Sequence, residues 1–325
     1  MTFDTIKNKT QQLLSIQNKK PVVILGLSGG PDSVFLFFVL KTLHDNRTIT
    51  LIAAHLDHGW RPDSDKDVEF CKNLCAQHAI HFEYSHIKDL AINPKYNGSQ
   101  EELGRNYRRH FFATLVQKHT ANFIALAHHQ QDQQETFFLR LLRGSTLSGL
   151  ACMNPIDGYY LRPLLHVDKQ TILTWLESNN ISYLHDPTNT SDNYLRNRIR
   201  NHIIPALKLC DDRFDQTFIN TLTALKNDHK FLQNLTHEVY QKTFALYRGT
   251  WQGSLSEFKA LDPHLQKRLL VHWLIQEKVP CTLSSNFIEE IMRFLLHDHG
   301  GSHDLNPSWS MCKKKNNFWI CKKNS

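Results

Sequence analysis

The chain has 325 residues, 41% of them hydrophobic, and its 38 Lys and Arg outnumber its 31 Asp and Glu, which gives a net charge of +7 and a pI of about 9.0. This length favours two domains that can each bury a core, and the basic balance favours a polyanionic partner such as nucleic acid. The apolar runs are too short to span a bilayer, and the N-terminus lacks a signal-peptide core. The 7 Cys include no Cys-x-x-Cys pair, which argues against a zinc ribbon or an iron–sulfur cluster. This cysteine pattern predicts a reducing cytoplasm as the location of the protein.

Strand and helix patterns alternate in the first half of the chain. Residues 21–27 are an unbroken apolar run rich in β-branched side chains, which predicts a buried strand, and residues 34–43 follow with helical spacing. The other predicted strands are 48–56, 81–87 and 122–127, and the other predicted helices are 63–78, 100–118 and 131–143. This order predicts a mainly parallel sheet with helices on both faces, in which ligands bind beyond the carboxyl ends of the strands.

The pattern loosens after Gly144. Residues 159–165 have the pattern of a strand end, and Asp168 can cap the helix that follows it. Long helical patterns dominate from about Arg213 to Leu296, before a short β-like tail. We therefore expect two domains, 1–212 and 213–325, of which the second is mainly helical.

A glycine-rich hexapeptide, Ser28-Gly29-Gly30-Pro31-Asp32-Ser33, joins the first predicted strand to its helix. Glycines allow a tight turn and a close approach to a ligand, and the free N–H groups at a helix start suit a phosphate. Asp32 would repel that anion, so we interpret it as a ligand of a magnesium ion that bridges to the phosphates. No Walker loop or dinucleotide fingerprint is present. The plainer interpretation is a turn with Asp32 as a helix cap.

This hexapeptide resembles the pyrophosphatase loop of the N-type ATP pyrophosphatases, the PP-loop superfamily. The resemblance implies a parallel-sheet ATP pyrophosphatase (adenine nucleotide alpha-hydrolase-like) domain of the α/β class. It also implies that ATP binds to the loop with Mg²⁺, and that adenylate is transferred to an oxygen atom. Further segments, within residues 21–207 and more weakly within 253–323, are similar to lysidine synthetases in this superfamily.

Two of these segments follow the second strand and begin the fourth helix. Residues 56–64 (LDHGWRPDS) resemble the family's V-D-H-G-L-R-x-x-S, although a loop with a helix cap is an equal alternative. Residues 101–109 (EELGRNYRR) resemble E-x-x-A-R-x-x-R-Y. Arg105 and Arg108 are three apart on one helix face, where two guanidinium groups can bind phosphates or stabilise developing charge. The Arg109 side chain is better explained as part of a solvated basic face.

Residues 127–136 (AHHQQDQQET) resemble the family's A-H-H-x-D-D-Q-x-E-T, with Gln131 in place of the first Asp. By this resemblance, Asp132 holds magnesium or assists the nucleophile, and His128 contacts the ATP phosphates. If the missing carboxylate were a metal ligand, this chain would bind the metal more weakly. A metal site on the two adjacent histidines is an alternative, but the spacing is not that of a zinc site. Glu135 is expected only to support the helix start.

Two later segments suit contacts with RNA. Arg143 begins a run that resembles L-x-R-G-[ST]-G-x-x-G-L and could admit a substrate base, although Gly144 is equally a helix C-cap. Residues 186–200 (DPTNTSDNYLRNRIR) resemble E-D-x-S/T-N-x-x-x-x-Y-x-R-N-x-I-R, and such arginines, asparagines and a tyrosine suit backbone phosphates and base stacking, unless they form a solvated helix start. The predicted tRNA-binding residues are Arg105, Arg143, Asn189, Tyr194, Arg196, Asn197, Arg198 and Arg200.

The resemblance implies ligation of L-lysine to C2 of the wobble cytidine of tRNA(Ile) with a CAU anticodon, after ATP has adenylated that base. The implied catalytic residues are Asp32, Asp132, Arg108 and His128, and a homodimer is compatible with the family. A tRNA thiolase is one alternative, which the absence of Cys-x-x-Cys disfavours. A non-catalytic tRNA-binding protein is another, and Gln131 keeps it open. An amidotransferase-type synthetase would need a glutaminase partner.

Overall fold

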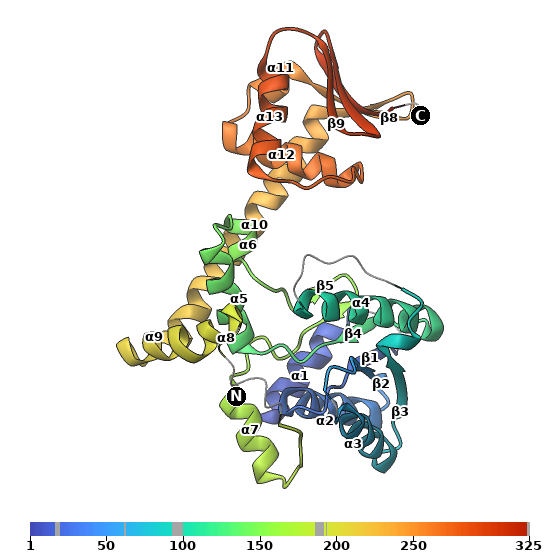
Figure 1. Cartoon of the computed structure of the whole chain (residues 1–325). Coiled ribbons are helices and arrows are strands. Elements are labelled where there is room, and N and C mark those ends of the chain that lie inside the picture. Colours follow the sequence, from blue (N-terminus) through green and yellow to red (C-terminus); the bar gives the residue numbers. More distant parts are fainter. Residues whose placement is uncertain (17–19, 62, 93–99, 186–191, 193, 324–325) are drawn as a thin grey trace. The chain divides into compact units, whose positions relative to one another are not determined.

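The computed structural model describes residues 1–16, 20–61, 63–92, 100–185, 192 and 194–323. The chain divides into two compact units, Met1–Thr223 and Ala224–Ser325, and helix α10 (Phe214–Thr243) begins in the first and ends in the second (Figure 1). The domain boundary after residue 212 stays a prediction. In the described residues, none of the helices has a stretch long and apolar enough to cross a membrane.

The first unit is built on a six-stranded sheet with the order β3-β2-β1-β4-β6-β5. Strands β1 to β4 and β6 are parallel, and β5 pairs antiparallel with β6, which confirms the predicted parallel sheet. The strands are β1 (Val22–Gly26), β2 (Thr50–Asp57), β3 (His81–His86), β4 (Phe123–Ala125), β5 (Ile156–Asp157) and β6 (Tyr160–Leu161).

Helices accompany the strands in the alternating order that the sequence predicts (Figure 1). They are α1 (Phe3–Leu14), α2 (Pro31–Asp45), α3 (Ser64–Gln77), α4 (Gln100–His119), α5 (Gln130–Leu142), α6 (Leu147–Leu150), α7 (Lys169–Ser178), α8 (Leu195–Arg198) and α9 (Ile204–Cys210), with a 3-10 turn η1 (Ile87–Asp89) and a π-helical turn η3 (Ile199–Ile203). The predicted cap of α7 is confirmed, because Asp168 Oδ1 accepts a hydrogen bond from the backbone N–H of Thr171 at 3.0 Å.

Both faces of the sheet are covered, which explains the unbroken apolar runs in the strands. Successive side chains of a strand point to opposite faces. On β1, Val23 and Leu25 pack into one core with helices that include α2, whereas Ile24 packs into a second core with Phe111 and Phe112 of α4. The parallel strands therefore end at one edge between two helical layers, and the glycine-rich loop follows β1 at that edge.

The second unit has its own core and a five-stranded antiparallel sheet with the order β7-β8-β11-β10-β9. Its strands are β7 (Phe244–Tyr247), β8 (Thr250–Ser254), β9 (Gly301–Asn306), β10 (Trp309–Lys314) and β11 (Asn317–Lys322), and its further helices are α11 (Leu255–Lys259), α12 (Pro263–Gln276) and α13 (Ser285–Leu296). The predicted β-like tail is the β9–β11 meander. The β7–β8 hairpin was not predicted, because its turn uses Arg248 and Gly249, both at positive φ, rather than the typical Asn-Gly.

Candidate active site

The glycine-rich loop between β1 and α2 leaves the first turn of the helix open. Gly30 is the N-cap of α2 and has no side chain to accept hydrogen bonds from that turn. The buried Ser33 hydroxyl closes the loop, because it donates to Gly30 O at 2.9 Å and accepts from Ser28 N at 3.2 Å. N–H groups without an intrahelical partner at the positive end of a helix are a ready site for a phosphate.

Gly29 is required by both its conformation and its neighbours. Its φ is +82°, and a Cβ built there would lie 2.6 Å from Leu184 Cδ1 and 3.3 Å from Phe70 Cδ1. Its carbonyl also accepts a hydrogen bond from Leu184 N at 2.9 Å. We expect Gly29→Ala to destabilise the first unit by about 1–3 kcal/mol in urea unfolding. Gly30→Ala is the control, since Gly30 has no positive φ and its nearest neighbour atom lies 3.7 Å away; equal losses in both variants would contradict this account.

Asp32, in the first turn of α2, pairs with a lysine that the sequence analysis did not single out. Lys169 Nζ donates to both Asp32 carboxylate oxygens, at 2.6 and 2.7 Å. Lys169 begins α7, which follows β6, so both residues lie at the carboxyl edge of the sheet. That shared position is the signal that could have suggested Lys169, because parallel strands deliver the residues that follow them to one edge.

His129, rather than His128, lies between the two carboxylates that were predicted to bind magnesium. Its Nε2 is 3.7 Å from Asp32 Oδ2 and 3.6 Å from Asp132 Oδ2. Carboxylate oxygens are the donors that Mg²⁺ prefers, so the chemistry of this donor set fits the ion. Each carboxylate also forms an ion pair with a cationic side chain, Asp32 with Lys169 and Asp132 with Arg196.

Gln131 keeps the hydrogen-bond acceptor of the aspartate that the family pattern has at this position, but not its charge. Its Oε1 accepts from the backbone N–H of Lys169 at 3.1 Å and lies 3.0 Å from His129 Nδ1. The amide therefore ties the start of α7 to α5 and orients the imidazole of His129. The departure from the family pattern leaves this part of the site assembled.

A fully buried carboxylate, Glu135, organises the next layer. Arg196 Nε donates to Glu135 Oε2 at 2.6 Å, and Arg200 donates from Nε and Nη2 at 2.5 and 3.1 Å. Arg196 also donates to Asp132 Oδ1 at 2.8 Å. Asp132 and Glu135 are three apart on α5, so they share a face. The spacing of Asp132 and Glu135 is visible in the sequence, but their pairing with Arg196 and Arg200 is not. Glu135 therefore does more than support the helix start.

These contacts shift the pKa of Asp132 and the pKa of Arg200. Burial by itself would raise the pKa of Asp132, but His129, His128 and Arg196 outweigh it and lower that pKa. Burial would likewise lower the pKa of Arg200, and its hydrogen bonds to Glu135 reverse the direction. The site thus contains the half-buried Asp132 and the fully buried Glu135, both hydrogen-bonded to guanidinium groups.

The predicted tRNA-binding residues divide into inward and outward groups. Arg196 and Arg200 direct their guanidinium groups to the carboxylates of Asp132 and Glu135. The side chains of Arg105, Arg108, Arg143, Tyr194 and Arg198 are exposed, and that of Asn197 is half-buried. Asn189 lies outside the described residues. A role for these residues in tRNA binding stays a prediction, and the outward group is the better placed for it.

Two departures from the family pattern compensate each other beside the site. Trp60 stands where the pattern has Leu, and its ring stacks on His58 with centroids 4.5 Å apart. A Cβ at Gly104, where the pattern has Ala, would lie 2.6 Å from Trp60 Cη2. The larger aromatic residue therefore requires the smaller helix residue, and together they place α4, with Arg105, against the 57–61 loop.

Two histidines at the site are neutral at physiological pH. Burial is the main cause that lowers the pKa of both His58 and His128 to about 4, and the nearby cations that add to it are Arg108 for His58 and chiefly Arg162 and Arg196 for His128. In the unfolded chain a histidine titrates near 6.5. The unfolded chain therefore binds more protons below that pH, and the stability contributed by the neutral imidazoles is lost as the pH falls from about 6.5 towards 4.

We therefore expect the free energy of unfolding to be lower at pH 5.5 than at pH 7.5, and His128→Gln to reduce that difference. Urea unfolding of the wild type and the variant at the two pH values measures it. His110→Gln replaces an exposed histidine of α4 as the control. The same pH dependence in His128→Gln as in the wild type would contradict the assignment.

Comparisons with known proteins agree with this geometry. Residues 3–207 match the PP-loop domain family, and residues 254–312 match the TilS substrate binding domain. The chain is 35% identical over 289 residues to the tRNA(Ile)-lysidine synthase of Geobacillus kaustophilus (strain HTA426), covering 86% of this chain and 61% of the relative. It is 34% identical over 283 residues to that of Bacillus subtilis (strain 168), covering 84% and 60%. This chain thus spans about 60% of the length of these relatives.

A solved structure shares the fold. The U34-tRNA thiolase NcsA from Methanococcus maripaludis, solved with its [4Fe-4S] cluster, superposes with a TM-score of 0.58 at 18% identity and covers 69% of this chain and 78% of its own. At this identity the similarity extends to the fold alone.

Proposed function

The chain belongs to the PP-loop domain family, and from this premise we propose that it binds ATP on the loop 28–33 and ligates L-lysine to the wobble cytidine of tRNA(Ile) with a CAU anticodon. One observation carries the proposal. Asp32, at the open helix start, faces His129 and Asp132 across the carboxyl edge of the sheet. The curated relatives and the match of 254–312 to a TilS substrate binding domain support the substrate.

The residues of the loop and its surroundings suit the first step. The N–H groups at the start of α2 would bind phosphate oxygens, and Lys169 Nζ, beside Asp32, is within reach of the same ligand. A magnesium ion, held by Asp32 and Asp132, would supply charge neutralisation on the phosphates. The cytidine O2 would attack the α-phosphorus while pyrophosphate leaves, and neutral His128 can hydrogen-bond to phosphate or base without adding charge.

The second step needs a deprotonated amine. The ε-amine of lysine would attack C2 of the adenylated cytidine, and the C2–O bond to AMP would break. Asp132, which the resemblance assigns to magnesium or to the nucleophile, is a carboxylate of this site that would accept the proton of the lysine ammonium. Its pKa is held low by His129, His128 and Arg196 against the effect of burial, so it would pass that proton on readily. A cytoplasmic location, as the cysteine pattern predicts, belongs to the same proposal.

A nucleoside assay tests the proposal. Unmodified tRNA(Ile) with the CAU anticodon is incubated with ATP, Mg²⁺ and lysine, and its nucleosides are analysed by mass spectrometry while pyrophosphate is measured. We expect lysidine at the wobble position, formation that depends on lysine, and none on a tRNA whose wobble cytidine is replaced with uridine. ATP turnover without lysine incorporation would instead support another PP-loop reaction, and no turnover at all would support a tRNA-binding protein.

A further inference from the structure

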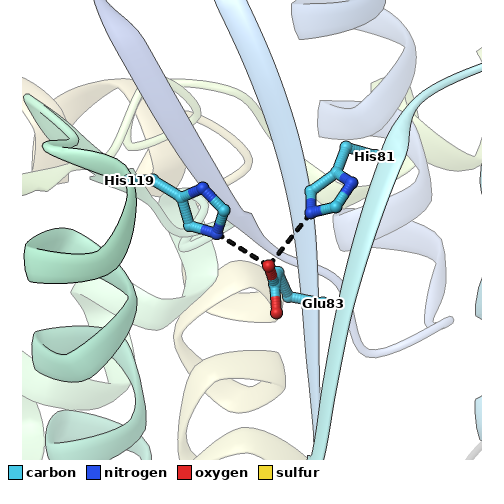
Figure 2. Close-up of side chains that lie close together, drawn as sticks. All are labelled: His81, Glu83 and His119. Carbon is cyan, nitrogen blue, oxygen red and sulfur yellow. Dashed lines mark hydrogen bonds and ion pairs between the residues drawn. The ribbon is translucent and has the colours of Figure 1, made fainter.

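Three side chains that the proposed reaction does not use converge on one oxygen atom (Figure 2). His81 Nε2 lies 3.0 Å and His119 Nε2 lies 2.7 Å from Oε1 of Glu83. The ligand atoms of all three residues lie within 4.8 Å of one another. His81 is exposed, whereas Glu83 and His119 are half-buried, so the cluster opens to solvent on one side.

The fold explains how this cluster is assembled. His81 and Glu83 alternate along β3 and therefore point to the same face of the sheet. β3 is an edge strand, and α4 packs on the face that carries Ile52 and Ala54, the partners of His81 and Glu83 on β2. His119 is the last residue of α4, and Figure 2 shows its ring turned towards the strand.

We propose that His81, Glu83 and His119 form a binding site for Zn²⁺. Imidazole nitrogen and carboxylate oxygen are the ligands that zinc takes in proteins, and three such ligands leave a fourth position for water. The Nε2 atoms of His81 and His119 both donate a hydrogen bond to the carboxylate oxygen Oε1 of Glu83, so each of these nitrogens carries a proton. One divalent cation replaces both protons and turns each Nε2 into a donor to the metal.

The ammonium group of Lys118 would compete with a metal ion for the carboxylate of Glu83. Its Nζ lies 2.8 Å from Glu83 Oε1 and 3.0 Å from Oε2, and 57% of its side chain is exposed. The lysine can therefore leave Oε1 to the metal and keep Oε2. Hydrogen bonds from Lys118, His81 and His119 outweigh burial and lower the pKa of Glu83 to about 2.

The ion would tie an edge strand to the C-terminal end of α4. The other end of α4 contacts the 57–61 loop through Gly104 and Trp60, about 22 Å away from His119 at about 1.5 Å per helical residue. We therefore expect zinc to stabilise the first unit without taking part in the chemistry.

Zinc titration of the metal-free 325-residue chain tests the site. Binding is measured by competition with a chromogenic chelator, and the melting temperature is recorded with and without Zn²⁺. We expect the wild type to bind one equivalent more than His119→Ala or His81→Ala and to gain thermal stability that these variants do not. Loss of a ligand should weaken binding by more than the about 10–100-fold that loss of an outer-shell partner costs.

Two further variants separate this site from other histidines. His110→Ala, an exposed position on the same helix, should bind zinc like the wild type. Lys118→Ala should bind it more tightly, because the competitor is gone. Circular dichroism establishes that each variant is folded, and Co²⁺ absorption bands from nitrogen and oxygen ligands provide a second readout. If His119→Ala and His81→Ala bind the same number of equivalents with the same affinity as the wild type, the proposal is overturned and the cluster is an ion-pair network.

Discussion

Asp32→Ala is expected to reduce pyrophosphate release from ATP on the cognate tRNA by about a hundredfold or more. The carboxylate stands in the first turn of α2, where phosphates would bind, and it is the proposed metal ligand that faces His129 and Asp132. Its removal leaves the charge of the triphosphate less neutralised, and losing one preorganised electrostatic contact at a reacting centre typically costs about 10²–10³ in rate. Lys169 would also lose its partner.

The control for this variant lies on the same helix. Asp45 pairs with Lys41 at 2.5 Å near the far end of α2, and about half of its side chain is exposed. Asp45→Ala removes the same kind of ion pair away from the site, and we expect its rate to match the wild type. Asp32→Asn removes the negative charge but keeps the shape of the side chain. We expect its rate of pyrophosphate release to be nearly as low as that of Asp32→Ala. Normal ATP turnover by Asp32→Ala would show that the loop is not used as proposed.

Glu135→Gln is expected to lower the free energy of unfolding by about 3 kcal/mol, the largest change in stability that we predict for a single site. Glu135 is fully buried and forms ion pairs with both Arg196 and Arg200. Breaking a buried ion pair leaves uncompensated charge and costs about 3–5 kcal/mol. The lower end applies because the side chains of Arg196 and Arg200 remain 21% and 36% exposed.

Urea unfolding of the first unit measures this change. Asp45→Ala serves again as the control, because an exposed pair four residues apart in a helix contributes only about 0.3–0.5 kcal/mol. A loss in Glu135→Gln no larger than that of the control would show that the buried network does not stabilise the fold. The same variant should also form less lysidine, since Arg196 bridges Glu135 to Asp132.

The sequence by itself determined the elements and the loop. Strands such as β1 and helices such as α2 follow from apolar runs and helical spacing, which are local properties. The hexapeptide 28–33 is equally local, because its glycines and the helix start lie within one short stretch of chain. Asp32 was identified from its place in that loop, and Asp132 from the resemblance of its segment to the family pattern.

Only the tertiary structure decided which residues meet. Lys169 contacts Asp32 across 137 positions of sequence, and Arg200 contacts Glu135 across 65. Whether a basic side chain faces a phosphate or a buried carboxylate depends on the packing of α5 against α8 and η3, which no local pattern specifies. His81, Glu83 and His119 meet for the same reason, because an edge strand and a helix end become neighbours only when the sheet and its covering helix assemble.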